Sequence, residues 1–263
     1  MFRLRARVAV PLILGLYMFT LYGPVLLLPL FSFNDSIYMT FPMKSFTTKW
    51  YAQMIEDSSL METLWASTKI ALLAAIVSTV FGFLAAKAMT RYRMRGRGVL
   101  FGFIMLPLIV PSIILGASLL TFFRLFLDIE LTLWTIGSAH VLISIPFSML
   151  VLIARLEGFD RNLEEASYDL GMGAWQTFRR VTLPLAMPGV LASLLLCFMV
   201  SFDEFLLAFF LTGNQATLPV YMYSLLRFPK FLPGILALGS CILVASVVVI
   251  TIAEWLRRGR EKV

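Results

Sequence analysis

Two adjacent acidic residues, Asp203 and Glu204, lie inside an apolar stretch of the sequence. An ionised side chain within hydrocarbon is energetically costly and normally faces a cavity or a partner group. Neighbouring residues of a helix point about 100° apart, so the two acids cannot face one point. At helical spacing, Glu204 shares one continuous face with small or polar residues, namely Ser193, Cys197, Ser201, Ala208 and Thr212.

This polar stripe has two interpretations. Small residues let helices approach closely, so the stripe can be a packing face between helices. The alternative is that Glu204, and less directly Asp203, attracts a cation that passes beside Ser201. Asp203 lies off the stripe and therefore ranks second. The sequence leaves both interpretations open.

A second group of polar residues lies in the amphipathic segment from Arg155 to Pro184. This segment contains more acids than the other segments rich in Lys and Arg, which are the two ends of the chain and the residues around Arg91–Arg97. Asn162 is followed three residues later by Glu165, the spacing of a capping box with Asn in place of Ser or Thr. A helix is therefore predicted with Asn162 as its cap. Its apolar residues share one face at a spacing of three and four, and these are Leu163, Ala166 and Leu170.

Two glycines, Gly171 and Gly173, predict the end of this helix, because glycine accepts the left-handed conformation that a C-cap needs. A second short stretch follows from Ala174 to Arg180, in which Trp175 and Phe178 can point the same way. The segment is thus predicted to be a short helix, a sharp glycine break and a second short helical piece.

The motifs of several enzyme classes are absent from the sequence, among them GxxxxGK[ST], HExxH, paired CxxC and the nucleophile elbow. His140 is the only histidine. It shares a stripe with Ser144 and Ser148, which favours an interhelical hydrogen bond over a catalytic role. Cys197 and Cys241 lie in apolar stretches and are interpreted as buried small residues. The sequence predicts no catalytic residue, metal ligand or bound cofactor in this chain.

Composition indicates the elements that must position these residues. Hydrophobic residues make up 60% of the chain and charged residues 14%, whereas a soluble domain carries roughly a quarter of charged residues. A helix needs roughly 20 apolar residues to cross a membrane, and the strands of a barrel would alternate instead. The expected fold class is an all-α integral membrane protein with six transmembrane helices. The six stretches are Val8–Phe31, Thr68–Ala88, Val99–Phe126, Leu131–Ala154, Leu185–Leu211 and Ile235–Trp255.

The first stretch also has the basic start of a signal peptide. It is too long for the apolar region of such a peptide, and no small-x-small cleavage pattern follows Phe31. We therefore interpret it as a membrane span.

Basic residues predict the orientation, because Lys and Arg concentrate in short cytoplasmic loops. Sixteen of the 22 Lys and Arg lie on the side that holds both termini, the segment from Lys87 to Arg97 and the segment from Arg155 to Pro184. These parts are predicted to be cytoplasmic. The net charge of +7 then reflects topology and attraction to anionic membrane lipid, and it gives no reason to expect nucleic-acid binding.

The segment between the fourth and fifth stretches resembles the EAA loop of permease subunits of binding-protein-dependent ABC importers. Glu165-Ala166-Ser167 is followed after three residues by Gly171, and after nine more by Val181-Thr182-Leu183-Pro184. The pattern in that family is EAAxxxG and then IxLP at the same spacing. Ser167 and Val181 are conservative departures from it. The resemblance implies the type I ABC importer permease fold, with a transport core at residues 68–255, a first helix and external loop at 1–67 and a basic tail at 256–263.

The resemblance also implies a coupling role for the loop, which in that family docks into a groove of the ATPase subunit. Glu165 would be the docking or loop-ordering acid, Gly171 the turn, and Trp175 and Phe178 the apolar contacts. The loop residues implied in coupling are Glu165, Ala166, Ser167, Asp169, Gly171, Trp175, Phe178, Leu183 and Pro184. An amphipathic helix on the lipid surface is the alternative. The acids of the segment disfavour it, because an anionic leaflet repels them.

Three further segments resemble the second permease of spermidine/putrescine-type importers, and they are Phe46–Tyr51, Leu183–Pro188 and Ser201–Glu204. This resemblance implies a partner permease of similar fold, two cytosolic ATPase subunits that bind ATP and Mg, and an extracytoplasmic solute-binding protein. The implied solute is a polyamine, and permeases for other small solutes share many of the same features. The residues do not indicate whether the two permeases are identical.

Two other functional classes fit the sequence less well than a permease. A secondary transporter is expected to contain internal repeats with interrupted helices at corresponding positions, and the sequence contains no detectable repeat. A membrane-embedded enzyme needs clustered His, Asp or Glu at the membrane face, and no such cluster is found in the sequence.

Overall fold

The computed structural model describes residues 2–43, 45–92 and 94–260, and the side chains among them at 11–43, 45–92, 94–248 and 251. These residues form helices, with a single isolated β-bridge between Asn34 and Phe46. The chain divides into two compact units. One unit contains the residues up to Met61 and those from Met222 onward, and the other runs from Glu62 to Tyr221.

The first unit is built on two long helices, α1 (Phe2–Ser32) and α12 (Leu232–Arg260), which pack against each other. A short helix, α2 (Lys49–Glu56), also packs on α12, and a 3₁₀ turn, η3 (Pro229–Phe231), leads into α12. The Trp50 indole donates to the Asn34 carbonyl oxygen at 2.9 Å. Lys49 pairs with Asp35 and holds the pKa of that carboxyl below its ordinary value.

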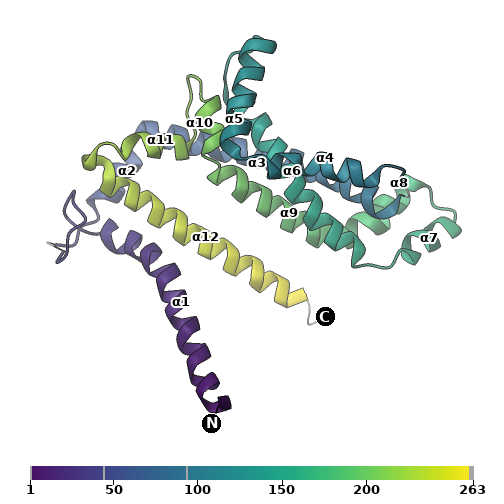
Figure 1. The fold of residues 1–263 in the computed structure, drawn as a ribbon, viewed down its shortest axis with the longest axis horizontal. Coiled ribbons are helices and arrows are strands. Elements are labelled where there is room, and N and C mark those ends of the chain that lie inside the picture. Colours follow the sequence, from purple (N-terminus) through teal and green to yellow (C-terminus); the bar gives the residue numbers. More distant parts are fainter. Residues whose placement is uncertain (1, 44, 93, 261–263) are drawn as a thin grey trace. The chain divides into compact units, whose positions relative to one another are not determined.

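The second unit contains the remaining helices (Figure 1), which are α3 (Ser58–Arg91, beginning at the unit boundary), α4 (Arg97–Ile109), α5 (Ser112–Thr121), η1 (Phe122–Phe126), α6 (Leu133–Glu157), α7 (Asn162–Asp169), α8 (Ala174–Thr177), η2 (Phe178–Thr182), α9 (Leu183–Asp203), α10 (Leu206–Leu211) and α11 (Leu218–Leu225, ending in the first unit). Helices α6 and α9 make the most extensive contact. Two buried apolar clusters hold the unit together. One contains Ile70, Ile136, Ala139, Ile143, Leu207, Ala208 and Leu211, and the other contains Phe83, Ala86, Met89, Met149, Leu152, Leu156 and Ala186.

Helices α3 and α6 approach closely at Gly82. A Cβ atom at this position would lie 2.1 Å from the Ser148 hydroxyl oxygen. Only glycine leaves room for this contact, which is typical of helices that pack within a membrane.

The expected fold class is confirmed. Within the described residues, five helical segments are long and apolar enough to cross a membrane, and a bent pair of helices supplies a sixth. The first, second, fourth and sixth predicted stretches correspond to α1, α3, α6 and α12.

The third predicted stretch, Val99–Phe126, is not one straight helix. Helices α4 and α5 meet at 97°. Pro111 precedes α5, and Val110 before it has an extended backbone with ψ 127°. A residue before proline is pushed out of the helical region, and proline has no N–H for the helical ladder. The proline therefore breaks this span, which the sequence analysis had treated as one continuous stretch.

The fifth predicted stretch, Leu185–Leu211, is also interrupted. Helix α9 ends at Asp203, Glu204 has an extended backbone with ψ 111°, and α10 begins at Leu206. The stripe predicted to run along one continuous helix is therefore split at Glu204. The Glu204 carboxylate accepts a hydrogen bond at 3.1 Å from the Leu207 N–H and satisfies a donor in the first turn of α10.

Candidate coupling loop and solute path

The segment between α6 and α9 is the candidate coupling loop. It contains α7, a turn, α8 and η2, and it lies beyond the neighbouring ends of α6 and α9 (Figure 1). The predicted pair of short helices is therefore confirmed. Their contacts within the loop and with α3 determine which side chains remain accessible.

The start of α7 differs from the prediction in its cap. Arg161 occupies the N-cap position without a side-chain capping bond, and Asn162 is the first helical residue. The Asp160 carboxylate accepts from the Asn162 backbone N–H at 3.0 Å and from its side-chain amide at 3.2 Å. Glu165 completes no capping box and is exposed. Asp160, two residues earlier, thus supplies the side-chain acceptor at this helix start, and the N–H that it satisfies is that of Asn162 itself.

The end of α7 confirms the role of one glycine and corrects that of the other. Gly171 has a φ of +82°, and no atom lies within 4 Å of the place where a Cβ would be. The backbone conformation alone therefore demands glycine here. Gly173 has a φ of −71° and is the N-cap residue of α8. It starts the second helix, so the prediction that both glycines stop the first is wrong for Gly173.

Two buried hydroxyl groups join the two short helices. Ser167 and Thr177 are buried, and their side-chain oxygens lie 2.8 Å apart. This hydrogen bond gives a physical reason for serine at the third position of the Glu-Ala-Ser run. Alanine would leave the Thr177 hydroxyl buried without that partner.

The acid that ties the loop to α3 is Glu164, which the sequence reasoning did not single out for this role. Its Oε2 atom lies 2.9 Å from the Arg91 Nε atom, and its other oxygen accepts from the Thr182 hydroxyl. Arg91 also donates to the Leu156 carbonyl oxygen at 3.1 Å. Arg91 at the end of α3 thus contacts both the loop, through the ion pair, and the end of α6, through the hydrogen bond. Two features of the sequence could have suggested this ion pair. A basic residue, Arg91, ends the second apolar stretch, and an acid, Glu164, lies in the first turn of the predicted loop helix.

The outer surface of the loop combines one acid with large apolar side chains. Glu165 and Ala166 are exposed. Leu170 is 80% exposed and Trp175 is 69% exposed. Exposed apolar groups of this size next to a charged side chain are typical of an interaction site. Asp169 is exposed at the end of α7.

Phe178 differs from Trp175, although both were predicted as docking contacts. The Phe178 ring packs edge-on against Phe83 with centroids 5.7 Å apart, and Lys87 lies 5.0 Å above it. Trp175 stacks on the same ring, with centroids 5.5 Å apart. Phe178 therefore supports Trp175 from within the permease. The remaining predicted loop residues, Leu183 and Pro184, form the first turn of α9.

The buried part of the polar stripe packs against neighbouring helices. The Ser193 hydroxyl donates to Ser148 at 2.7 Å and lies 3.1 Å from the Thr79 hydroxyl. The Cys197 thiol donates to the Ser144 carbonyl oxygen at 3.5 Å. These contacts join α9 to α3 and α6 and correspond to the packing-face interpretation for this half of the stripe. Cys197 is buried as predicted, whereas Cys241 is exposed on α12, so the interpretation of both cysteines as buried is wrong for Cys241.

Ser201 belongs to the same packing face. Its hydroxyl oxygen lies 2.8 Å from Nδ1 of His140, which is buried on α6. The predicted interhelical hydrogen bond of the single histidine is therefore confirmed.

The two acids of α9 differ in their surroundings. Asp203 is the last residue of α9 and is exposed. Glu204 is half-buried, and one of its oxygens caps α10. The more accessible negative charge therefore belongs to Asp203, which reverses the ranking derived from the stripe. Ser201, Asp203 and Glu204 remain candidates for the solute path.

Comparisons with known proteins agree with the geometry of the loop and the spans. Residues 78–262 match the family described as binding-protein-dependent transport system inner membrane component. The chain is 34% identical over 243 residues to the spermidine/putrescine transport system permease protein PotC of Escherichia coli strain K12, covering 92% of this chain and 91% of PotC. It is 35% identical over 249 residues to the putrescine transport system permease protein PotI of the same strain, covering 92% and 88%.

Solved structures show a similar fold. A chain in the crystal structure of a bacterial alginate ABC transporter, in complex with a periplasmic protein that binds alginate pentasaccharide, matches with a TM-score of 0.73 at 16% identity. The match covers 97% of this chain and 95% of that chain. A chain of an amino acid ABC transporter matches with a TM-score of 0.58 at 17% identity, covering 81% and 99%.

Proposed function

Because the chain belongs to the family of inner membrane components of binding-protein-dependent transport systems, we propose that it is the permease subunit of an ATP-driven importer of polyamines such as spermidine or putrescine. The observation that carries the solute proposal is the similarity to PotC and PotI along 92% of the chain. Residues 68–255 would form the transport core, residues 1–67 the first helix and external loop, and residues 256–263 the tail.

The energy for transport would come from partner subunits. We propose two cytosolic ATPase subunits that bind ATP and Mg, a second permease, which is expected to be a paralogue, and an extracytoplasmic solute-binding protein. The coupling loop supports the ATPase part, because Glu165, Leu170 and Trp175 form an exposed acidic and apolar surface. A glycine turn and the Ser167–Thr177 hydrogen bond make this surface compact. Such a surface can transmit the closure of an ATPase to the membrane helices.

The basic residues support an orientation in which the loop and both termini are cytoplasmic. The loop would then face the compartment in which ATP is hydrolysed. The protein would be a multi-pass protein of the bacterial inner membrane.

A polyamine is a chain of ammonium groups, so its path through the membrane needs negative charge. We propose that Asp203 provides the principal charge, because its side chain is exposed, and that Glu204 contributes with the oxygen that does not cap α10. Ser201 lies two residues before Asp203, on the packing face. Two unit charges about 4 Å apart attract each other by about 1 kcal/mol in water and about 4 kcal/mol at an effective dielectric constant near 20.

Uptake of radiolabelled spermidine into vesicles that contain the complete importer tests this proposal. Uptake should require ATP, the binding protein and both permeases. Absence of ATP-dependent spermidine and putrescine uptake by an assembled complex that transports another small solute would refute the polyamine assignment. Uptake driven by an ion gradient without ATP would instead support a secondary transporter.

Two matched substitutions test the solute path. Asp203→Asn should raise the KM for spermidine at least about fivefold, the equivalent of about 1 kcal/mol. Glu204→Gln keeps an acceptor for the Leu207 N–H and should have a smaller effect. Unchanged transport by both variants in a fully assembled complex would assign the acids to helix packing alone.

A further inference from the structure

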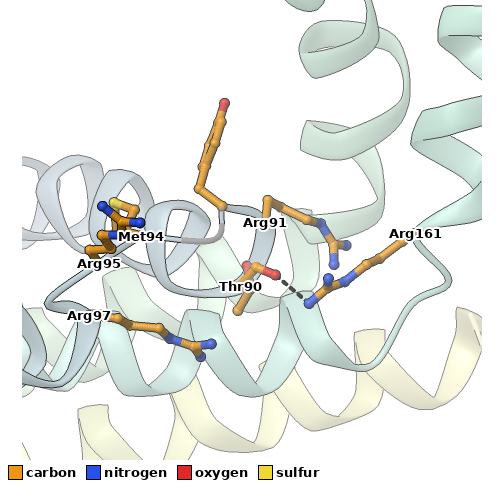
Figure 2. Close-up of a pocket in the computed structure, with 7 residues that line it drawn as sticks. Thr90, Arg91, Met94, Arg95, Arg97 and Arg161 are labelled. Carbon is orange, nitrogen blue, oxygen red and sulfur yellow. Dashed lines mark hydrogen bonds between the residues drawn. The ribbon is translucent and has the colours of Figure 1, made fainter.

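A cavity of about 450 Å³ lies where α3 ends and α4 begins (Figure 2). It is lined by Thr90, Tyr92 and Met94 and by four arginines. The arginines belong to the last turn of α3, the start of α4 with the loop before it, and the residue before α7, and they are Arg91, Arg95, Arg97 and Arg161. Positive charges from distant parts of the sequence thus gather around one cavity.

Most of this charge is not neutralised by the protein. Arg91 pairs with Glu164. Arg161 donates to the uncharged Thr90 carbonyl oxygen, as the dashed line in Figure 2 shows. Within the described part of the chain, neither Arg95 nor Arg97 forms an ion pair. Three of the four guanidinium groups are therefore in no ion pair with an acid of the described residues.

The start of α4 adds to the attraction for an anion. This helix has thirteen residues, and its N-cap, Gly96, provides no side-chain acceptor for the first N–H groups. These groups carry the partial positive charge of the helix dipole. Arg97, the first residue of the helix, lines the cavity.

We propose that this cavity binds the phosphate group of an anionic phospholipid. Arginine guanidinium groups match phosphate oxygens in geometry and charge, and the volume suits a ligand the size of a lipid headgroup. A lipid is favoured over a free anion because the cavity lies at the ends of two apolar helical segments, α3 and α4. Tyr92 at its edge is 59% exposed, and tyrosine is typical of the membrane interface.

Occupancy of the cavity is linked to the coupling loop by the residues of its wall. Arg91 holds Glu164 of α7, and Arg161 is the N-cap residue of the same helix. A phosphate between these arginines would reduce their mutual repulsion and stabilise the start of α7. This consequence rests on the proposed coupling function, whereas binding of the lipid does not depend on it.

The test uses the complete importer in nanodiscs of phosphatidylcholine with increasing phosphatidylglycerol, and native mass spectrometry measures the phosphatidylglycerol that remains bound. Arg95→Gln combined with Arg97→Gln removes the two arginines without ion pairs. Each is expected to weaken retention about fivefold, so the pair should weaken it about 25-fold. Arg179→Gln with Arg180→Gln is the control, because these arginines are also exposed, lie outside the cavity and change the net charge equally. The control should retain lipid as the unmodified complex does.

Equal retention by the two double variants would overturn the proposal. Displacement of the lipid by inorganic phosphate, at an ionic strength matched with chloride, would overturn the lipid assignment in favour of a soluble anion. If the cavity variant assembles poorly, a photoactivatable phosphatidylglycerol on the unmodified complex still decides, because it should label peptides that contain Tyr92 or Met94. Labelling confined to other peptides would refute the site. These readouts require no transport, so a failure of the polyamine proposal would remain distinguishable.

Discussion

Replacing Glu164 by glutamine should detach the coupling loop from α3. The substitution removes the negative charge and keeps the size of the side chain. Glu164 and Arg91 are only 12% and 7% exposed, and the joined atoms lie 2.9 Å apart. The glutamine can still accept from the Thr182 hydroxyl, but it leaves the Arg91 charge largely buried beside a neutral group. Loss of one partner from a buried ion pair costs about 3 to 5 kcal/mol.

This free energy applies to opening of the loop, because the ion pair joins the loop to α3 and contributes little to packing elsewhere. A destabilisation of about 3 kcal/mol corresponds to a rise of roughly a hundredfold in the open population, since each 1.4 kcal/mol is about tenfold. Amide hydrogen exchange of peptides from α7 and α8, measured by mass spectrometry on the permease complex without ATPase, reports that population. Exchange should be faster in these peptides and unchanged in α6 and α9.

Glu165→Gln is the matched control, because it changes the same charge at the next residue, where the side chain is exposed. It should leave loop exchange unchanged and reduce co-purification of the ATPase. Equal loop protection in the Glu164→Gln variant and the unmodified protein would refute the anchoring role of the ion pair. Loss of loop protection in the Glu165→Gln variant would show that the two acids had been assigned to the wrong roles.

Three further predictions concern the turn, the path and the orientation. Gly171→Leu should destabilise the loop by about 1 to 2 kcal/mol because of its left-handed backbone, measured as lower ATPase recovery, while Gly173→Ala, at a φ of −71°, should have little effect. Asp203→Asn should reduce spermidine uptake at subsaturating concentration while uptake at saturation is largely kept, and an unchanged concentration dependence would contradict its role. A cysteine placed at exposed Gln215 should react in intact cells with a reagent that cannot cross the membrane, whereas one at exposed Gln176 should not; the reverse pattern would contradict the orientation.

Much of the coupling loop could be predicted because its signals are local. The left-handed turn at Gly171 follows from the residue type and its position after an amphipathic run. The roles of Asn162 and Gly173 were less determined, since several neighbouring residues can supply a cap. Asp160 has the acceptor that reaches the Asn162 N–H. The residue that caps a helix is determined by the backbone angles at each residue of the helix end, and a single sequence does not contain that information.

Contacts between distant segments could not be predicted in the same way. Glu164 and Glu165 are adjacent acids with the same local pattern, and only the position of Arg91 at the end of α3 distinguishes them. Likewise, Thr177 is a polar residue in an exposed-looking loop, yet it is buried against Ser167. Burial of a polar side chain depends on the partner that satisfies it, and such partners follow from tertiary packing.

The break after α9 has a consequence for the solute path that periodicity along the sequence could not reveal. No proline or glycine lies between Ser201 and Phe205, so the apolar run is typical of an uninterrupted helix. In the structure the 21-residue helix α9 ends at Asp203. The carbonyl groups of its last turn carry the negative end of the helix dipole, which adds to the charge of the exposed carboxylate. The opposing dipole of α10 is small because that helix has only six residues, and Glu204 caps its positive end. A helix end and an acid at the same point make a more favourable place for an ammonium group than the side chain alone, and this is why Asp203, and not the stripe residue Glu204, is expected to dominate recognition of a cationic solute.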